Sequence, residues 1–311
     1  MRIFTDNVLF AESMIAPLQE WKAADGSDQK ASVSTLIERL FSERIVYQNV
    51  ADAGANWTHA FIVRKAPASQ FDVLVDLSNT QPDMPGGIIC LAGTGHGFHG
   101  QRKRRWASLE GNLHLAVHLV PERKIARFGV GFPILAAVSL VESIDTIAGL
   151  AGKASIKWVN DVLCDGAKIA GFLVHTSSMD ETVSSVVLGF GLNIEKTPEI
   201  QSDPYVPKVG SIRDYIGEKA VLDQRHILST LLDRLSANYE VLLKGQWRQL
   251  LEAYRKRSVV VGRRVRILSD PEDDIQEELG SGKVLAIGDS LELWLDGIEE
   301  PVKKGRLILT D

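Results

Sequence analysis

The stretch Lys157-Trp158-Val159-Asn160-Asp161 leads through the turn Asp165-Gly166 into Lys168-Ile169-Ala170-Gly171. It places two lysines and an Asn-Asp pair on two short apolar segments joined by a tight turn. A buried ammonium group loses its hydration, so it is stable only where a negative group meets it. The stretch therefore predicts a hairpin whose polar side chains converge on one small anionic ligand.

Length and composition predict a protein with a substantial core. The chain has 311 residues and is 45% hydrophobic, which is enough for one large domain and one small domain. Cys90 and Cys164 lie in apolar runs without a spaced framework, which indicates a reducing compartment and favours the cytoplasm. The start of the chain lacks a secretory pattern, and the most apolar window, residues 130–150, contains a proline and two carboxylates. We therefore expect no membrane span.

The charge of the chain argues against a nucleic-acid partner. The formal net charge is −5, so the overall field repels polyanions. The densest basic run is Arg102-Lys103-Arg104-Arg105. Such a run is typical of a solvated face or a nonspecific anion patch, and only its neighbours can distinguish these from a specific site.

Apolar periodicity predicts the elements of the first half of the chain. Helical spacing predicts helices near residues 8–11 and 36–41, separated by a polar loop at 23–30. Strand-like runs are expected at residues 44–49, 60–64, 71–77, 87–91 and 112–119. The last run alternates strictly, which predicts a strand with one buried face.

The second half predicts an α+β arrangement with a small β domain at its end. Residues 128–150 should form a buried helix on a sheet built from strands near 156–162, 168–176 and 183–194. Asp223 is the predicted N-cap of a long amphipathic helix. After Arg257 short alternating segments, the first at 259–261, predict a small barrel. We expect domains at residues 1–257 and 258–311.

The loop from Gly93 to Trp106 combines four glycines with the four cations of the basic run. Glycine allows close approach of the backbone, and guanidinium groups neutralise phosphate oxygens. The loop lacks the Gly-Lys-Ser/Thr ending of a Walker loop. Two interpretations therefore stay open, a loop that closes over a nucleotide and a flexible surface loop.

The histidines and serines do not favour metal or hydrolase chemistry. His96 and His99 are three residues apart, and His114 and His118 are four apart. A four-residue separation in a strand spans roughly 13 Å, too far for two ligands of one ion. We expect no structural metal. A serine hydrolase is not supported either, because the G-x-S-x-G motif is missing.

Several features fit one reaction, the joining of a carboxylic acid to the α-phosphate of ATP. Two anions must approach each other, so cations must shield them: Lys168 on the acid side and Arg102 or Arg104 on the nucleotide side. The acyl-adenylate reacts with water, which explains a loop able to close over it. Asn160 and Asp161 could hold Mg²⁺ or position the nucleotide, although Asn-Asp alone is an ordinary turn signal.

Three motifs in this order resemble those of biotin protein ligases, in the biotin/lipoate ligase superfamily. They are Lys157 to Asp161, Lys168 to Gly171, and Gly189-Phe190-Gly191-Leu192-Asn193. The resemblance runs from about Gly87 to the C-terminus. It implies a class II synthetase-like ligase domain, with a mixed sheet packed against helices, followed by an SH3-like C-terminal barrel.

Two further segments carry the resemblance. Trp106-Ala107-Ser108 followed by Gly111-Asn112-Leu113 is similar to the family's segment after its nucleotide loop. Gly305-Arg306-Leu307 lies near the end of the expected barrel, as in the family. Thr5-Asp6-Asn7 is the candidate match to the family's early Ser-Thr-Asn motif, which leaves residues 31–85 as additional material. The family's N-terminal DNA-binding helix-turn-helix is not expected here.

The resemblance implies roles for individual residues. Lys168 would contact the biotin carboxylate and the adenylate, with Arg102 and Arg104 as further catalytic cations, and Asp161 is the candidate Mg²⁺ ligand. The expected contacts to substrate and nucleotide are Gly97, His99, Gly100, Gln101, Trp106, Asn112, Lys157, Asn160, Asp161, Gly171, Gly189, Gly191 and Asn193. Among these, Trp106 would flank the nucleotide, and the last three would line the floor of the pocket.

The implied activity has two steps. Biotin and ATP would form biotinyl-adenylate, with Mg²⁺ as cofactor, and a lysine of a biotin carboxyl carrier protein or carboxylase domain would attack it. A homodimer is compatible with this activity. Two alternatives stay open, a ligase for lipoate, octanoate or another acyl group, and a non-catalytic homologue that binds biotin or an adenylate.

The chain departs from the family pattern at several positions. His99 and Gln101 stand where family loops are richer in arginine. Val159 replaces the usual proline of the lysine-tryptophan motif, and His175 replaces the usual glutamate after the second motif. The loop departures motivate the non-catalytic alternative.

Overall fold

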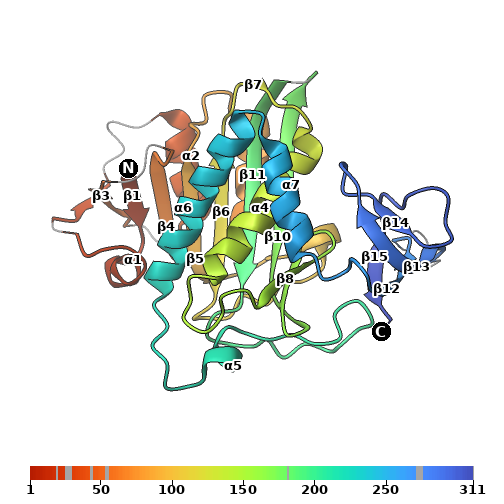
Figure 1. Ribbon diagram of the computed structural model, residues 1–311. Helices are drawn as coiled ribbons and strands as arrows, with labels where there is room; N and C mark the ends of the chain where they lie inside the picture. Colours follow the sequence, from red (N-terminus) through yellow and green to blue (C-terminus); the bar gives the residue numbers. More distant parts are fainter. Residues whose placement is uncertain are drawn as a thin grey trace.

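The computed structural model describes residues 1–18, 20–24, 30–42, 45–52, 56–180, 182–270 and 276–310. Figure 1 shows a large twisted sheet with long helices packed across it, and a small second sheet at the C-terminal end of the chain. The predicted α+β class is confirmed.

The large sheet has eleven strands within the described ranges. They are β1 (Arg2–Thr5), β2 (Lys22–Ala23), β3 (Tyr47–Val50), β4 (His59–Ala66), β5 (Ile88–Gly95), β6 (Leu113–Leu119), β7 (Arg123–Lys124), β8 (Ala154–Lys157), β9 (Asp161–Cys164), β10 (Ala167–Met179) and β11 (Thr182–Leu192). Their order is β2-β3-β1-β4-β5-β6-β11-β10-β9-β8, with β7 paired to β11. The pairs β1–β4 and β4–β5 are parallel, and the pairs along the rest of this order are antiparallel.

Three long helices pack together on one face of this sheet, α4 (Phe128–Ile144), α6 (Gln224–Leu243) and α7 (Trp247–Arg257) (Figure 1). Asp223 caps α6 by accepting a hydrogen bond from the backbone N–H of His226 at 3.2 Å, as predicted. The apolar stripe of α6 is buried at Ile227, Leu228, Leu231, Leu235, Tyr239 and Leu242. Helix α4 ends at Ile144, before the predicted end at residue 150.

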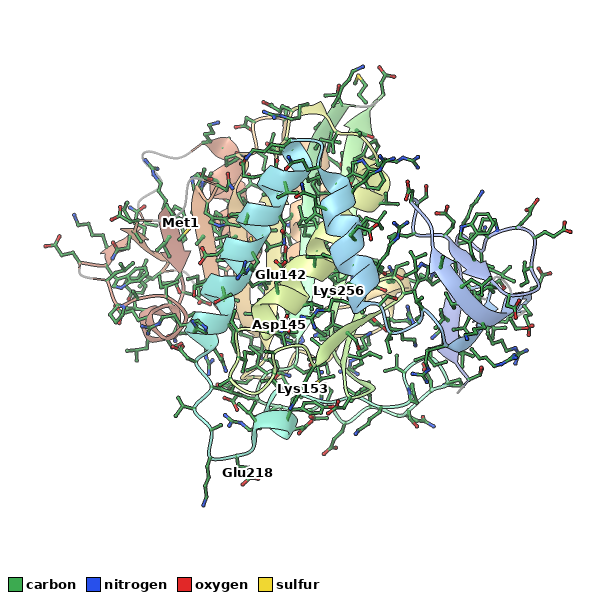
Figure 2. The ribbon with its side chains drawn as sticks, in the orientation of Figure 1. Met1, Glu142, Asp145, Lys153, Glu218 and Lys256 are labelled. Atoms are coloured by element: carbon green, nitrogen blue, oxygen red, sulfur yellow. The ribbon has the colours of Figure 1, made fainter. Side chains whose placement is uncertain are left out.

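The carboxylates that interrupt the apolar window have local partners on α6 and α7. Glu142 accepts a hydrogen bond from Asn238 of α6 at 3.1 Å, and Asp145 forms an ion pair with Arg257 at the end of α7. Figure 2 labels Glu142 and Asp145 among the side chains of this helical layer. The helices described here include none that is long and apolar enough to cross a membrane.

Two helices pack on a second core cluster, α2 (Ala31–Leu40) and α3 (Gln70–Thr80). The prediction of a strand at residues 71–77 is wrong, because this segment belongs to α3. Ser69 caps the helix by accepting from the N–H of Asp72 at 3.3 Å, and Val73, Leu74 and Leu77 form its buried side. The parallel strands β4 and β5 also require a crossover between them, which a helix supplies.

Strand β6 is buried on both faces, so the prediction of a single core face is wrong. It lies in the middle of the sheet between β5 and β11, with one core cluster on each side. Leu115 and Val117 belong to the first cluster and Ala116 to the second. The alternating His114 and His118 are therefore buried rather than solvated.

The remaining elements of the first 220 residues are short. Helix α1 (Val8–Met14) confirms the first predicted helix, α5 covers Arg213–Ile216, and a 3₁₀ turn covers Gln101–Lys103. Strand β1 was not predicted, and the strand expected at 44–49 begins at Tyr47. Its residue 44, and residues 25–29 of the expected polar loop, lie outside the described residues.

The C-terminal sheet is antiparallel, in the order β14-β13-β12-β15. Its strands are β12 (Arg264–Leu268), β13 (Glu278–Ile287), β14 (Leu293–Leu295) and β15 (Arg306–Leu309). Residues 259–261 are not a strand, contrary to the prediction. Trp158 joins the two sheets by donating a hydrogen bond from Nε1 to the carbonyl of Leu291 at 2.6 Å, and the peptide bond from Trp158 to Val159 is cis. The domain boundary after residue 257 stays a prediction.

Candidate functional site

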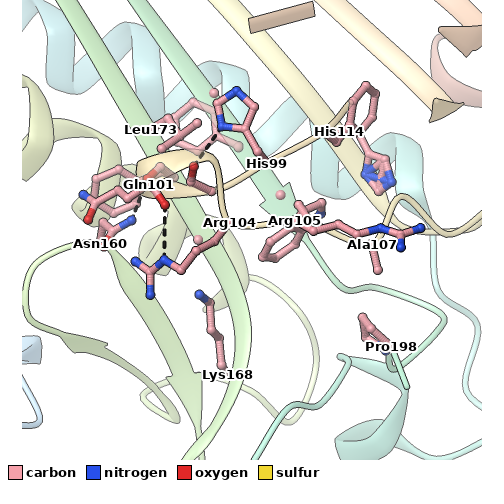
Figure 3. Close-up of a pocket in the computed structure, with 18 of the residues that line it drawn as sticks. His99, Gln101, Arg104, Arg105, Ala107, His114, Asn160, Lys168, Leu173 and Pro198 are labelled. Atoms are coloured by element: carbon pink, nitrogen blue, oxygen red, sulfur yellow. Dashed lines mark hydrogen bonds between the residues drawn. The ribbon is translucent and has the colours of Figure 1, made fainter. Parts of the chain in front are cut away.

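A cavity of about 350 Å³ lies where the first turn of α3 faces the large sheet. Strands β6, β10 and β11 form its floor, and α3 forms one wall. Residues 98–101, 104–107, 160–161 and 193, with several residues between 198 and 209, complete the lining. Figure 3 shows Lys168, Arg104 and His114 around this cavity, from β10, the loop and β6 respectively. The fold thus joins segments that are far apart in the sequence.

Glycines stand side by side in adjacent strands of the cavity floor. Gly191 of β11 pairs with His114 of β6 on one side and with Gly171 of β10 on the other. A Cβ at Gly191 would overlap the indole ring of Trp106. At Gly189 a Cβ would lie 2.8 Å from the ring of Phe71. The two glycines therefore allow both aromatic rings to pack directly against the strand backbone.

One ion pair marks the mouth of the cavity. Lys168 Nζ lies 2.6 Å from Asp161 Oδ1, and the two side chains are only 20% and 18% exposed. Lys168 Nζ also lies 5.8 Å from the centre of the Trp106 ring, within the range of a cation–π contact. Gly171 packs beside the pair, since a Cβ there would stand 3.6 Å from both charged groups. The negative partner of this partly buried ammonium group is thus Asp161.

The other lysine of the hairpin lies elsewhere. Lys157 is 5% exposed, does not line the cavity, and donates a hydrogen bond to the carbonyl of Tyr205. Burial lowers the pKa of its ammonium group, and the nearby Asp161 opposes this only in part. Asn160 does line the cavity, and its Nδ2 fixes the hairpin by donating to the carbonyl of Phe172 at 2.8 Å.

The structure brings most of the predicted site residues to this cavity. Those that line it are His99, Gly100, Gln101, Arg104, Trp106, Asn160, Asp161, Lys168, Gly171, Gly189, Gly191 and Asn193. Gly97, Arg102, Asn112 and Lys157 do not. Arg102 is 55% exposed at its side chain and pairs with Asp270, beyond the end of β12. Gly97 lines a neighbouring cavity that shares His99 and Trp106 with the first.

Asn112 does not line the cavity but binds the segment that follows β11. Its Oδ1 accepts three backbone N–H groups, those of residues 194, 195 and 196, at 3.0 to 3.1 Å. Its Nδ2 donates to the carbonyl of Lys196 at 2.8 Å. Asn193 continues this support by donating to the carbonyl of Gly210 at 3.0 Å. The two asparagines thus hold the segment that leads from β11 to the outer wall of the cavity.

A charged cluster fastens the glycine-rich loop to α3. His99 Nε2 lies 2.9 Å from Asp72 Oδ2, and Lys103 Nζ lies 3.0 Å from Asp72 Oδ1. His99 Nδ1 donates to the carbonyl of Gly100 at 2.8 Å. Burial acts to raise the pKa of Asp72, but hydrogen bonds from Lys103 and His99 outweigh it and hold that pKa below its ordinary value.

Several polar atoms of the cavity lining are buried without a partner among the residues that the structure places. Trp106 lies beside the mouth, and we call the part of the lining formed by Gln70 and His114 the inner end. Within the described residues, Gln70 Nε2, Trp106 Nε1 and both ring nitrogens of His114 make no hydrogen bond. Gln70 and His114 are each 3% exposed. Burial lowers the pKa of His114 to about 4, so its imidazole is neutral at neutral pH. The ring of Phe98 meets His114 edge-on, with the ring centres 5.3 Å apart.

Several lining residues were not predicted from the sequence, namely Ser69, Gln70, Phe71, Phe98, Arg105 and His114. Thr5-Asp6-Asn7, the candidate for the early motif, does not line the cavity. Thr5 donates to the carbonyl of Ile62, and Asn7 caps α1. Ser69, the N-cap of α3, lines the cavity instead. A serine N-cap shortly after the end of β4 could have indicated it, had α3 been recognised as a helix.

The described residues contain no cluster of three or more His, Cys, Asp or Glu side chains that could hold a metal ion. Two carboxylates line the cavity, Asp161 and Asp203, and Asp161 is already paired with Lys168. Such a donor fits Mg²⁺ that is held mainly by phosphate oxygens and water rather than by a protein cage.

Comparison with known proteins agrees with this geometry. The family described as the biotin/lipoate A/B protein ligase family matches residues 70–193, from the start of α3 to the end of the third motif. The biotin acetyl-CoA-carboxylase ligase of Mycobacterium tuberculosis is 30% identical over 232 residues, which cover 72% of this chain and 80% of that protein.

A second relative matches over a shorter range. The bifunctional ligase/repressor BirA of Bacillus subtilis is 29% identical over 167 residues, 52% of this chain, and the match spans half the length of BirA. Among solved structures, the biotin protein ligase from Aquifex aeolicus in complex with biotin and ATP superposes with a TM-score of 0.61 at 17% identity. That match covers 82% of this chain and 99% of the other, and it shows a shared fold.

Proposed function

The chain belongs to the biotin/lipoate A/B protein ligase family, and we propose that it activates biotin with ATP and transfers it to a lysine of a carrier protein. The observation that carries this proposal is the partly buried Lys168–Asp161 pair beside Trp106 at the mouth of the cavity. A cation in this position can meet a carboxylate from the cavity and a phosphate from outside at the same time.

In the first step, a carboxylate oxygen of biotin attacks the α-phosphorus of ATP. The bond from this phosphorus to the bridging oxygen breaks, and pyrophosphate leaves with the bonding electrons. Lys168 faces both anions and reduces the repulsion between them. Asp161 fixes the ammonium group 2.6 Å away, so that little reorganisation is needed as charge develops on the phosphate.

The loop supplies further positive charge on the nucleotide side. Arg104 and Arg105 both line the cavity, and guanidinium groups suit phosphate oxygens. Mg²⁺, when bound with ATP, would add Lewis-acid stabilisation of the phosphate charge beside Asp161. The two arginines would hold the nucleotide against the indole ring of Trp106, and this ring would also keep water from the mixed anhydride.

In the second step, the neutral amine of a carrier lysine attacks the carbonyl carbon of the adenylate. The bond to the phosphate oxygen breaks, AMP leaves, and the nitrogen loses a proton as the amide forms. The name of the Mycobacterium tuberculosis relative points to the carrier domain of an acetyl-CoA carboxylase as the acceptor class. A cytoplasmic location and a homodimer stay predictions.

Pyrophosphate exchange into ATP tests the first step, and transfer of biotin to a carrier domain tests the second. We expect exchange that depends on biotin. Exchange with lipoate or octanoate alone would support the acyl-ligase alternative, and no exchange with any acid would support the non-catalytic alternative. His99 and Gln101, the loop departures that motivate the non-catalytic alternative, both line the cavity.

A further inference from the structure

We propose that Asp72 is a positioning residue that holds the glycine-rich loop against α3, so that the loop stays closed over the cavity while the adenylate is present. Asp72 borders the neighbouring cavity rather than the main one, and it acts through His99 and Lys103 of the loop. This inference rests on the proposed function, because it concerns the intermediate of that reaction. It also gives a role to His99, which departs from the arginine-rich loops of the family.

The loop moves as one unit because its two sides are hydrogen-bonded to each other. The N–H of Trp106 donates to the carbonyl of Phe98 at 2.9 Å. The N–H of Gly100 donates to the carbonyl of Arg104 at 2.7 Å. Arg104 and Trp106 line the main cavity. A contact that fixes His99, between Phe98 and Gly100, therefore also fixes the side of the loop that faces the nucleotide.

Asp72 is well placed to make this contact. It lies in the first turn of α3, where its N–H donates to the Oγ of Ser69 at 3.3 Å. The Nε2 of His99 is 3.0 Å and 2.9 Å from its two carboxylate oxygens, and the Nζ of Lys103 is 3.0 Å from Oδ1. The side chain of His99 is only 11% exposed, and its ring meets that of Phe71 edge-on. Partial burial strengthens hydrogen bonds to a charged group, so the carboxylate joins the loop firmly to the helix.

The backbone at the tip of the loop needs such support. Arg102 and Lys103 have φ angles of 57° and 56°, in the left-handed region that residues other than glycine rarely adopt. Two such residues in succession are unfavourable unless the surrounding contacts hold them. The contact from Lys103 to Asp72 supplies this support. Loss of the carboxylate should therefore let the tip relax and the loop open more often.

Limited trypsin cleavage of the ligand-free full chain tests the closed loop without any reaction. Residues 102–105 are all lysine or arginine, and a protease cuts a loop mainly when the loop opens. Asp72→Asn should raise the rate of cleavage within this run by about three- to tenfold, and Asp72→Glu should return the rate part of the way to the wild-type value. Mass spectrometry of the fragments identifies the cut sites. An unchanged rate in Asp72→Asn would overturn the inference.

Pyrophosphate release from biotin and ATP without a carrier measures how long the adenylate is retained. The first turnover releases one pyrophosphate per site as a burst, and each later turnover requires the adenylate to leave. Asp72→Asn should raise the slow rate after the burst by about three- to tenfold and leave the size of the burst unchanged, because Asp72 lies outside the main cavity. Asp72→Glu should again restore part of the wild-type behaviour. A smaller burst with an unchanged slow rate would overturn the inference, since it would indicate a role in activation or folding.

Asp76→Asn is the matched control, one turn further along α3. Asp76 pairs with Arg39 of α2 at 2.9 Å and borders neither cavity. This substitution removes the same charge from the same helix, so both assays should give the wild-type result, and the same changes as in Asp72→Asn would overturn the inference. If trypsin separates the Asp72 variants but no pyrophosphate release depends on biotin, the proposed function fails while the closed loop is supported.

Discussion

The mouth and the inner end of the cavity differ in how their polar side chains are accommodated: the mouth contains an ion pair, and the inner end contains neutral groups. At the mouth, Lys168 is charged and paired with Asp161 at 2.6 Å. At the inner end, His114 and Gln70 are neutral and have unpaired nitrogens in the described part of the chain. The mouth therefore neutralises a charge with a partner, whereas burial at the inner end keeps the imidazole of His114 uncharged at neutral pH.

This difference suggests a division of labour. A fixed ion pair is preorganised and can act on charge that develops during the reaction. A buried neutral imidazole instead resists protonation, because the charged form would lose its hydration. We therefore expect changes at the mouth to alter the rate of activation and changes at the inner end to alter how stability depends on pH.

The largest effect is expected at the mouth. Lys168→Ala should reduce biotin-dependent pyrophosphate exchange by about 10²- to 10³-fold, because it removes a preorganised cation. Lys157→Met is the matched control from the same motif. It should destabilise the fold by about 1–3 kcal/mol, since the carbonyl of Tyr205 loses its partner, while exchange persists. Normal exchange in Lys168→Ala would disprove the role assigned to this lysine.

The inner end should make stability depend on pH. The pKa of His114 is lowered from 6.5 to about 4 by burial, so between these values the unfolded chain binds a proton that the folded chain excludes. Wild type should therefore lose up to about 3 kcal/mol as pH falls through this window, relative to His114→Leu. Denaturant unfolding of both proteins at pH 7.5 and about pH 4.5 measures this. If the free energy of unfolding fell by the same amount in both proteins between these pH values, a neutral, buried His114 would be contradicted.

The floor between the two ends should be sensitive to a single methyl group. Gly191→Ala would displace the Trp106 ring and should raise the KM for ATP by about tenfold or more. Gly129→Ala, on an exposed part of α4 with nothing near its Cβ, should leave KM unchanged and add at most about 1 kcal/mol of stability. Steady-state kinetics and thermal unfolding separate the two outcomes, and an unchanged KM in Gly191→Ala would argue against nucleotide binding beside Trp106.

The smallest effect is expected from the arginine that lies outside the cavity. Arg102→Ala breaks an ion pair whose arginine side chain is more than half exposed, so stability should change by at most about 1 kcal/mol. Exchange should change by less than about twofold, whereas Arg104→Ala should raise the KM for ATP by about tenfold. Equal effects of the two substitutions on KM would show that the loop moves Arg102 into the site.

Local signals predicted the hairpin around residues 157–171, the Asp223 cap and the buried helix α4. Each depends on neighbours within a few residues, such as a turn, a cap or a helical stripe. The same signals failed at residues 71–77, where alternation within a short apolar run did not distinguish a strand from α3. The parallel pairing of β4 and β5, which requires a crossover, involves residues far apart in the chain.

By itself, the sequence determined that lysines, an Asn-Asp pair, glycines and an arginine-rich loop occur in an order that suits an acyl-activating site. Only the tertiary structure decided that Lys168 and Arg104 reach the cavity while Lys157 and Arg102 do not. It also decided that His114 is buried with no hydrogen-bond partner in the part of the chain that the structure describes. The physical reason is that residue type fixes the charge and hydrogen-bonding capacity of a side chain, whereas strand register and the packing of distant segments fix its neighbours.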